Sequence, residues 1–388
     1  MEFFETLKKR KITVTTGARA DYGLLRPILS EILSSKNLDL FLIVTGMHLS
    51  KKYGLTINEI KKDGFKISAS FNMLQKGNSK HLMSRAIGKA VIEFSNFFNK
   101  IQPDINVILG DRDEMLASAI SAYHMNIPNA HIHGGDRSGG IDEYTRHAIT
   151  KISNIHFATS QKSKERILRM GENAKYVFFT GSPAVDEVKN NKITDKKTLE
   201  SKYGFKFSGN EILFLQHPVT TQIESTKNQI TNSLKAIQMI DQPTITIAPN
   251  SDAGNNVIFK HLAAFSKSHT SFMLFKSLPR SDYLGMLKNC KVLVGNSSSG
   301  IIESSYFKIP VVNIGIRQKN REKGSNVLNA EDNSVVSIHN KLVKALKMKK
   351  QYLSTASIYG DGNAAKKIVK HLETIKLNHI LIEKQISY

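Results

Sequence analysis

The sequence predicts an α/β protein made of two doubly wound parallel sheets. Apolar, strand-like runs alternate with amphipathic helical segments along the whole chain, which favours parallel sheets covered by helices on both faces. A chain of 388 residues, with about a dozen such units, is long enough to form two cores. We therefore expect two Rossmann-like domains joined near 181–183, with a ligand bound in a central cleft.

Six apolar runs in the first half are rich in Ile, Val and Phe, and each ends in a glycine or a polar turn, as strands do. They are residues 11–16, 38–45, 105–109, 129–133, 155–158 and 176–179. Four segments between them have apolar residues three and four positions apart, which predicts amphipathic helices. These helices are expected at 24–33, 80–98, 115–124 and 162–170.

The second half repeats this alternation of strands and helices. Strands are predicted at 212–216, 244–248, 272–275, 292–294 and 311–314. Helices are predicted at 222–240, 257–266, 282–288, 300–306, 340–348 and 363–372. The repetition favours two domains of the same architecture over one large sheet.

The composition is that of an ordinary soluble protein, with 40% hydrophobic and 23% charged residues. The single cysteine, Cys290, excludes a disulfide framework, fits a reducing compartment, and is expected to be buried beside the strand at 292–294. The N-terminal charges follow a very short apolar stretch, unlike those of a signal peptide. No apolar run approaches the roughly 20 residues that span a bilayer. We expect a cytoplasmic protein that does not bind membranes.

The formal net charge of +22 raises the possibility of nucleic-acid binding. The lysines are spread along helical surfaces, however, and no recognition-helix, zinc or RNA-binding signature is present. A nucleic-acid partner is therefore not expected, whereas an anionic small substrate would benefit from the same positive field. The spacing of the histidines does not suggest a metal site.

Acidic and imidazole side chains gather where two successive strands end and at the start of the helix that follows. They are Asp111, His131, His133, Asp136 and Asp142. In an open α/β sheet the carboxyl ends of the strands bind ligands, so this cluster predicts an active site. In the alternative, structural interpretation, Asp111 and Asp142 only cap the helices that begin near them.

Two loops are candidates for phosphate binding. The first leads from the strand at 11–16 through Gly17 to Arg19, whose guanidinium could grip phosphate oxygens, although an ordinary strand-to-helix turn explains it equally well. The second carries Ser298, Ser299 and Gly300 into a helix, and predicts an anion-binding nest rather than a simple serine cap.

Further candidates for ligand binding lie in the second half. Glu303 is one turn beyond the serine loop, where a carboxylate could accept hydrogen bonds from ribose hydroxyls, which favours a nucleotide over free phosphate. His217 ends the strand at 212–216, and Arg317 and Arg321 follow the strand at 311–314. All are expected at the carboxyl edge of the second sheet.

Along nearly the whole chain, motifs that contain these residues follow one another in the same order as in the UDP-N-acetylglucosamine 2-epimerase family. The chain resembles especially the hydrolysing branch of that family, which serves sialic and related nonulosonic acid synthesis. The motifs that carry the resemblance are Thr16-Gly-Ala-Arg-Ala-Asp-Tyr-Gly, Thr45-Gly-Met-His-Leu-Ser50, Leu109-Gly-Asp-Arg112, Ala130-His-Ile-His-Gly-Gly-Asp136, Ile141-Asp-Glu-Tyr-Thr-Arg-His147, His217-Pro-Val-Thr220, Gly295-Asn-Ser-Ser-Ser-Gly-Ile-Ile-Glu303, Asn313-Ile-Gly-Ile-Arg-Gln318 and Tyr359-Gly-Asp-Gly-Asn363.

The resemblance implies a glycosyltransferase-B-like fold. It places a catalytic domain at 1–180, a nucleotide-binding domain at 181–372, and a C-terminal helix at about 373–388 that crosses back to the first domain. It also implies a homo-oligomer, a dimer or tetramer, whose partner is a small nucleotide sugar. No metal and no cofactor is implied.

The family reaction removes the proton beside the acetamido group of UDP-N-acetylglucosamine and expels UDP to give a glycal. Water then adds with inversion, which releases N-acetylmannosamine. The resemblance makes Asp111 and Asp142 two catalytic acids, leaves the third role open between His133 and Asp136, and gives His217 a place at the diphosphate or the leaving oxygen.

The resemblance also implies a set of substrate-binding residues, most of them at the diphosphate, with Glu303 on the ribose and Arg280 near the uracil. They are Arg19, Arg112, Arg280, Ser298, Ser299, Gly300, Glu303, Arg317 and Arg321.

Four alternatives remain open. A non-hydrolysing epimerase of the same fold is disfavoured by Arg-Ala-Asp-Tyr at 19–22 and by His-Gly-Gly at 133–135, where that branch usually has Arg-Pro-Glu and Glu-Ala-Gly. A 4-acetamido-6-deoxy sugar, as in legionaminic acid synthesis, would differ only in pocket contacts. A glycosyltransferase would need an acceptor, and a non-enzymatic binding protein would not require the two aspartates.

Overall fold

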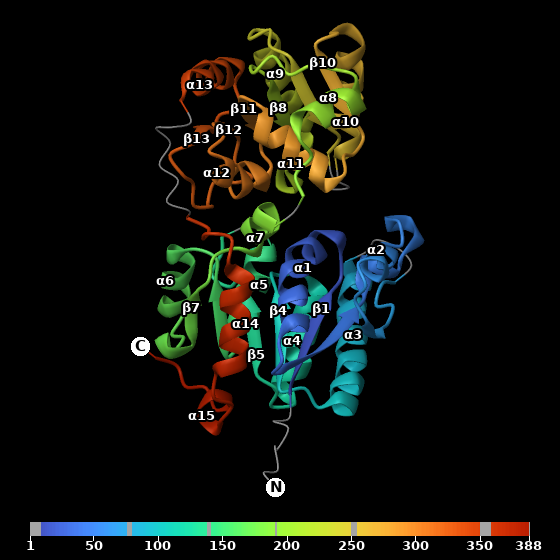
Figure 1. The fold of residues 1–388 in the computed structure, drawn as a ribbon, viewed down its shortest axis with the longest axis vertical. Helices are drawn as coiled ribbons and strands as arrows, with labels where there is room; N and C mark the ends of the chain where they lie inside the picture. Colours follow the sequence, from blue (N-terminus) through green and yellow to red (C-terminus); the bar gives the residue numbers. More distant parts are fainter. Residues whose placement is uncertain are drawn as a thin grey trace. The chain divides into compact units, whose positions relative to one another are not determined.

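The computed structural model describes residues 9–75, 80–137, 141–190, 192–249, 254–349 and 358–387. The chain divides into two compact units, Met1–Glu187 with Tyr359–Tyr388, and Val188–Ile358. Each unit contains one parallel sheet flanked by helices, so the predicted fold class is confirmed (Figure 1). Residues 1–8, which hold most of the N-terminal stretch that was compared with a signal peptide, lie outside the described part.

The first unit has a seven-stranded sheet in the order β3-β2-β1-β4-β5-β6-β7, and every pair of neighbours is parallel. Its strands are β1 (Arg10–Thr16), β2 (Leu38–Val44), β3 (Ile67–Ser70), β4 (Ile105–Leu109), β5 (Asn129–Ile132), β6 (Ile155–Ala158) and β7 (Val177–Phe179). Its helices are α1 (Arg19–Ser34), α2 (Ile57–Lys62), α3 (Lys80–Ile101), α4 (Asp113–His124), α5 (Ile141–Lys151), α6 (Gln161–Arg169), α14 (Ala364–Thr374) and α15 (His379–Ile382). Helix α7 (Pro183–Asn190) begins in this unit and contains the boundary at 187/188.

The second unit has a six-stranded parallel sheet in the order β10-β9-β8-β11-β12-β13. Its strands are β8 (Ile212–Leu215), β9 (Thr244–Ile247), β10 (Phe272–Phe275), β11 (Val292–Gly295), β12 (Val311–Ile314) and β13 (Val327–Ala330). Its helices are α8 (Lys196–Tyr203), α9 (Thr226–Gln238), α10 (Asn255–Ser268), α11 (Arg280–Asn289), α12 (Glu303–Phe307) and α13 (Val335–Lys347). Cys290 is buried in this unit, as expected.

Both sheets carry apolar helices on their two faces. In the first unit α1 and α14 pack in one core with β1, β2, β4, β5 and β6, while α3 and α4 form a second core that includes Ile43 of β2. In the second unit α9, α10 and α13 share one core, and α8 and α11 share the other. Burial of continuous apolar strands on both faces is what holds these parallel sheets together.

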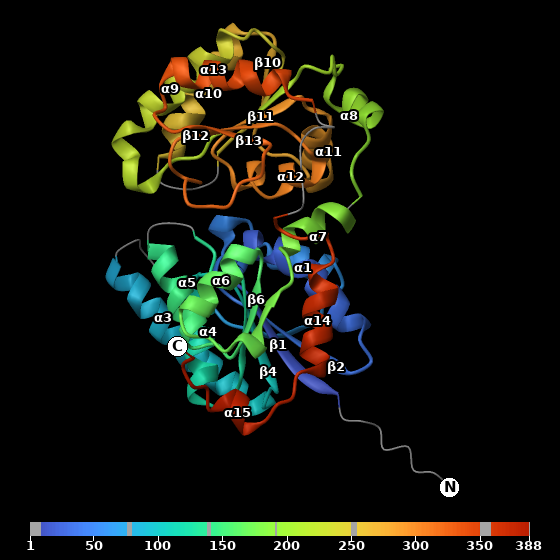
Figure 2. The same cartoon turned by 90° about the vertical axis from the view of Figure 1, so that its left-hand side faces the viewer.

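The C-terminal helices belong to the first unit. Figure 2 shows α14 and α15, coloured red, beside the first sheet. The domain boundaries fall at 187/188 and 358/359, whereas the sequence analysis placed them at 180/181 and 372/373. The second boundary was misplaced because α14 carries a strong apolar face, and its Ile368 and Leu372 are fully buried in the core that contains α1.

Candidate active site

Asp111 and His133 lie at the carboxyl ends of the neighbouring strands β4 and β5. Asp111 follows Gly110, which has a φ of +81°, and His133 itself has a φ of +67°, in the left-handed region that few residues other than glycine adopt. Helix α4 begins at Asp113, with Arg112 as its N-cap and no side-chain cap hydrogen bond. Asp111 therefore does not cap this helix, which removes the structural interpretation considered for it.

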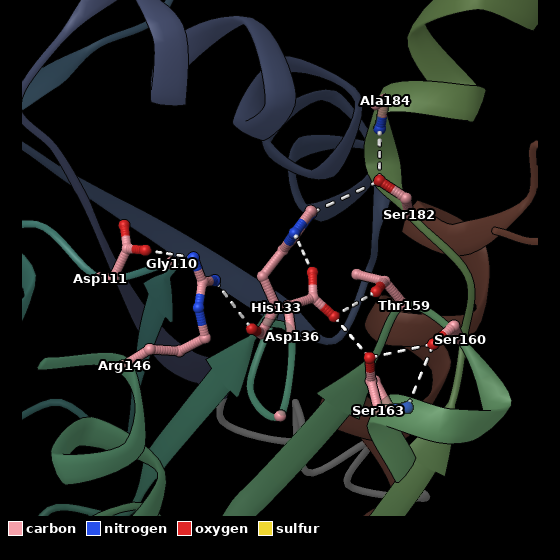
Figure 3. Close-up of polar contacts among 12 residues, drawn as sticks. Gly110, Asp111, His133, Asp136, Arg146, Thr159, Ser160, Ser163, Ser182 and Ala184 are labelled. Atoms are coloured by element: carbon pink, nitrogen blue, oxygen red, sulfur yellow. Dashed lines mark hydrogen bonds and ion pairs between the residues drawn. The ribbon is translucent and has the colours of Figure 1, made fainter. Parts of the chain in front are cut away.

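Arg146 of α5 joins the two strand ends (Figure 3). Its Nη2 forms an ion pair with Oδ2 of Asp111, and its Nη1 donates to the backbone oxygen of His133 over 3.0 Å. Arg146 is buried, so the fork of its guanidinium orients both groups in a site with little water.

His133 and Asp136 form a buried pair (Figure 3). The Nδ1 atom of His133 lies 3.0 Å from Oδ2 of Asp136, and Oδ1 of Asp136 accepts from the hydroxyls of Thr159 and Ser163, each at 2.6 Å. Burial alone would raise the pKa of Asp136, but the hydrogen bond and charge of His133, with Arg146 and Ser163, outweigh it and hold the pKa below its usual range. Asp136 is therefore a carboxylate, and Nδ1 of His133 carries a proton.

His131 supports the loop that carries Asp111. Its Nε2 lies 2.8 Å from the backbone oxygen of Gly110, and its Nδ1 lies 3.2 Å from the hydroxyl of Thr150. Burial lowers the pKa of His131 to about 3, so the ring is neutral at physiological pH. A neutral ring with a proton on Nε2 satisfies both contacts, which makes His131 a structural support for Gly110.

Asp142 is the second residue of α5, near the start of α4. Burial raises the pKa of Asp113, and the charges of Glu114 and Asp142 raise it further. Asp142 therefore adds negative charge to the same edge of the sheet as Asp111.

The N-terminal loop differs from the phosphate site considered for it. The backbone N–H groups of Gly17 and Ala18 donate to the carboxylate of Asp21, which occupies the start of α1 where a phosphate was expected. The Arg19 side chain is 71% exposed, and its Nε lies 3.3 Å from Oε2 of Glu59. The internal carboxylate explains why this loop does not form an open anion site.

Arg112 is held by two acids. Its Nε lies 2.5 Å from Oε1 of Glu114 and 3.8 Å from Oδ2 of Asp21. Burial and the charge of Glu114 raise the pKa of Asp21 to about 7. Arg112 thus follows β4 at the carboxyl edge of the first sheet, with its guanidinium already paired.

In the second unit, Asn296 holds His217 at both backbone atoms. Oδ1 of Asn296 accepts from the His217 N–H over 2.7 Å, and Nδ2 donates to the His217 oxygen over 2.8 Å. The backbone oxygen of Asn296 accepts from Arg317 and from Gln318, both at 3.1 Å. The ends of β8, β11 and β12 are thereby tied together, and they bring His217 and Arg317 to one edge, as predicted.

The serine loop and Glu303 form a second connected group in this unit. Ser298 to Gly300 form a short 3₁₀ turn, and the hydroxyl of Ser299 donates to Glu303, which also pairs with Arg280. The phenol of Tyr283 bonds the same serine hydroxyl. Arg280 was expected near a base, and the structure shows that it orients the Glu303 carboxylate. Arg321 follows Gln318, to whose oxygen its N–H donates over 3.3 Å.

Within the described residues no group of three or more His, Cys, Asp or Glu side chains is arranged to hold a metal ion. Of the helices in that same part of the chain, none has the length and apolar character needed to cross a membrane.

The model of one protein family, UDP-N-acetylglucosamine 2-epimerase, matches residues 30–373. The chain belongs to this family. A Legionella pneumophila protein named UDP-N,N'-diacetylbacillosamine 2-epimerase (hydrolyzing) is 39% identical over 380 residues, which cover 98% of this chain and 100% of the relative. A Campylobacter jejuni protein named GDP/UDP-N,N'-diacetylbacillosamine 2-epimerase (hydrolyzing) is 37% identical over 87% of this chain and 88% of the relative.

Solved epimerase structures share the fold. The Neisseria meningitidis UDP-GlcNAc 2-epimerase bound to UDP-GlcNAc superposes with a TM-score of 0.79 at 16% identity, covering 93% of this chain and 99% of that structure. A Listeria monocytogenes structure described as an epimerase of this kind gives a TM-score of 0.77 at 16% identity, over 94% and 96% of the two chains. The epimerase fold is thus glycosyltransferase-B-like with two Rossmann-like domains, as predicted.

The sequence analysis did not single out several residues of the candidate site. Arg146, Thr159 and Ser163 lie on or before helices, where a polar residue is indistinguishable from a surface residue by pattern alone. The signal that could have indicated Arg146 is its position in the motif at 141–147, one turn after Asp142.

Proposed function

We propose that the protein is a hydrolysing 2-epimerase that converts a UDP-linked 2-acetamido sugar into UDP and the free 2-epimeric sugar. The observation that carries this proposal is the match of 39% identity over all of a relative whose name includes the word hydrolyzing. A second hydrolysing relative matches at 37%. Relatives named only as UDP-N-acetylglucosamine 2-epimerases from Bacillus subtilis and Methanocaldococcus jannaschii match at 21% and 24%.

We propose UDP-N,N'-diacetylbacillosamine, a 4-acetamido-6-deoxy sugar nucleotide, as the preferred substrate, and UDP-GlcNAc as the second candidate. The names of the two relatives that are 39% and 37% identical both include the diacetylated sugar. A protein of Neisseria meningitidis serogroup B named UDP-N-acetylglucosamine 2-epimerase is 33% identical, and an Escherichia coli polysialic acid biosynthesis protein is 35% identical. The higher identity to the first two relatives favours the diacetylated sugar as substrate. The proposed reaction is the same for either sugar.

The reaction has two balanced steps. A base takes the C2 proton while the C1–O bond breaks and UDP leaves with its electron pair, giving a glycal. Water then adds its hydroxyl at C1 and a proton reaches C2 from the opposite face, which inverts that carbon. Because the C2 proton is weakly acidic, positive charge develops at C1, and carboxylates near it lower the barrier.

We infer roles for this reaction from the contacts of the side chains. His133 is the group that exchanges a proton through Nε2, because its Nδ1 is committed to Asp136. Asp136 is a positioning residue, because three donors already bind its carboxylate. Asp111, oriented by Arg146, stabilises the charge at C1, and Asp142 serves as the second acid–base group.

The second unit supplies the nucleotide contacts in this proposal. The diphosphate is bound by His217, Arg317 and the turn from Ser298 to Gly300, because these groups lie at the ends of β8, β12 and β11. Glu303 accepts from the ribose, with Arg280 and Ser299 orienting its carboxylate. Arg19, Arg112 and Arg321 stay predictions as diphosphate ligands, as does the expected homo-oligomer.

The proposal is tested by assaying release of the nucleoside diphosphate: UDP from UDP-N,N'-diacetylbacillosamine and from UDP-GlcNAc, and GDP from the GDP-linked diacetylated sugar. NMR identifies the sugar that is released. We expect a free 2-epimeric sugar in equal amount to UDP, and the highest kcat/KM for the UDP-linked diacetylated sugar. An intact UDP-linked 2-epimer would indicate the non-hydrolysing reaction. Turnover only after addition of an acceptor would indicate a glycosyltransferase, and either result would refute the proposal.

A further inference from the structure

Ser182 contacts the nitrogen of His133 that the proposed reaction uses. Its Oγ lies 3.4 Å from Nε2 of His133 and also accepts from the N–H of Ala184 at 3.3 Å (Figure 3). Ser182 is fully buried, in the segment between β7 and α7. The His133 ring is therefore held at both nitrogens, by Asp136 on one side and by Ser182 on the other.

A hydroxyl suits this position for a physical reason. Asp136 fixes the proton of His133 on Nδ1, so Nε2 of the neutral ring is a hydrogen-bond acceptor and the Ser182 hydroxyl can donate to it. When the ring gains a proton, Nε2 becomes a donor and the same hydroxyl can rotate to accept. The distance of 3.4 Å is longer than that of a strong hydrogen bond. The contact of Ser182 with Nε2 is therefore weak enough to give way when Nε2 exchanges a proton with the substrate.

The position of Ser182 is set by a close approach of two chain segments, 180–182 and 359–360, which we call the chain crossing. The N–H of Ser182 donates to the oxygen of Tyr359 over 2.7 Å. Gly181 and Gly360 have φ values of +87° and +93°, and a Cβ on Gly360 would lie 2.7 Å from the Cα of Gly181. Only glycines permit this approach.

The carboxylate of Asp186 also holds the two segments of the chain crossing together. Asp186 accepts from the N–H groups of Ala364 and Ala365, at 2.8 and 2.6 Å, at the start of α14. The chain leaves the first unit after Glu187 and returns to it at Tyr359, so both connections to the second unit begin or end within a few residues of the crossing.

We propose that Ser182 is a positioning residue that ties the ring of His133 to the chain crossing, so that a shift of either connecting segment moves the proton-exchanging nitrogen. This inference rests on the proposed function for its effect on turnover. The contact itself concerns the ligand-free protein and can be measured without any substrate.

The test compares Ser182→Ala with the wild type, and uses Ser121→Ala as a matched control. Ser121 is also buried, and its hydroxyl bonds only the backbone oxygens of Val91 and Ala117 among the contacts described. In ¹⁵N NMR of the ligand-free protein at one pH, with the His133 signals assigned through His133→Gln, we expect Ser182→Ala to shift Nε2 toward an unbonded nitrogen and leave Nδ1 unchanged. With substrate, kcat should fall about tenfold while KM stays nearly constant.

A third variant tests the crossing without touching His133. Gly360→Ala should push the segments apart and reproduce the Nε2 shift; if circular dichroism shows that it does not fold, Asp186→Asn replaces it. An Nε2 signal and a kcat in Ser182→Ala equal to those of the wild type would overturn the proposal, as would equal changes in Ser121→Ala. A wild-type protein that releases no UDP would refute the proposed function, while the ligand-free NMR comparison would still decide the role of Ser182.

Discussion

Arg146 binds Asp111 through one nitrogen of its guanidinium and the backbone oxygen of His133 through another, and so fixes two strand ends relative to each other. The two groups come from different strands and belong to the proposed chemistry of one sugar ring. A buried side chain from a third element, α5, therefore helps to set their separation, together with the pairing of β4 with β5.

Arg146→Lys is expected to lower kcat about 10- to 100-fold, because a single ammonium cannot occupy both sites of the guanidinium fork. The midpoint of thermal unfolding should also fall, since the change leaves a buried acceptor poorly paired. Steady-state kinetics and calorimetry measure the two effects. Arg26→Lys, at an exposed pair with Asp63, is the control and should change neither. Unchanged turnover in Arg146→Lys would show that the fork does not position the site.

Asp136→Asn is expected to lower kcat by at least about 100-fold, although the two side chains have nearly the same volume. The neutral amide cannot hold the proton on Nδ1 of His133 as a carboxylate does, so the ring can adopt the wrong tautomer. Asp39→Asn removes a half-exposed carboxylate on β2 and serves as the control. A variant with normal kcat and a His133 proton still on Nδ1 would contradict the assigned role.

Asp142→Asn is expected to lower kcat by at least about 100-fold, because it removes the charge and the proton-transfer capacity of the proposed second acid–base group. The binding of UDP, measured by calorimetry, should stay within a factor of two or so, because the diphosphate contacts come from other residues. Near-normal turnover would remove Asp142 from the mechanism.

The pKa of His131 predicts a loss of stability in acid. Burial lowers this pKa from 6.5 to about 3, so between these values the unfolded state binds a proton that the folded state does not. Stability should therefore fall as the pH drops from about 6.5 toward 3. His131→Gln should be less stable at neutral pH and show a shallower decline. Urea unfolding at several pH values measures both slopes, and parallel slopes would contradict the assignment of a neutral buried ring.

The sequence predicted the central strands well because buried parallel strands are continuous apolar runs. The edge strands β3 and β13 were missed, since Ile67–Ser70 and Val327–Ala330 are short and contain polar residues that an edge tolerates. Helix α1 begins at Arg19, five residues before the predicted start, because Asp21 satisfies the N–H groups of its first turn.

Local sequence patterns predict only those residues of the candidate site that directly follow apolar strands. Asp111, His133 and Asp136 follow apolar strands, so their common edge could be inferred from the chain alone. Our proposed choice of His133 over Asp136 rests on the contacts of Asp136 with Thr159, which follows β6, and with Ser163 of α6. Such long-range pairing leaves no periodic trace in a single sequence.

The central claim is that this site breaks the C2–H and C1–O bonds and returns a free sugar. The most direct measurement is NMR of the products formed from UDP-N,N'-diacetylbacillosamine in deuterated water, without an added acceptor. We predict a free 2-epimeric sugar that carries one deuteron at C2, together with an equal amount of UDP. A released sugar that keeps its original C2 hydrogen and configuration would contradict the account.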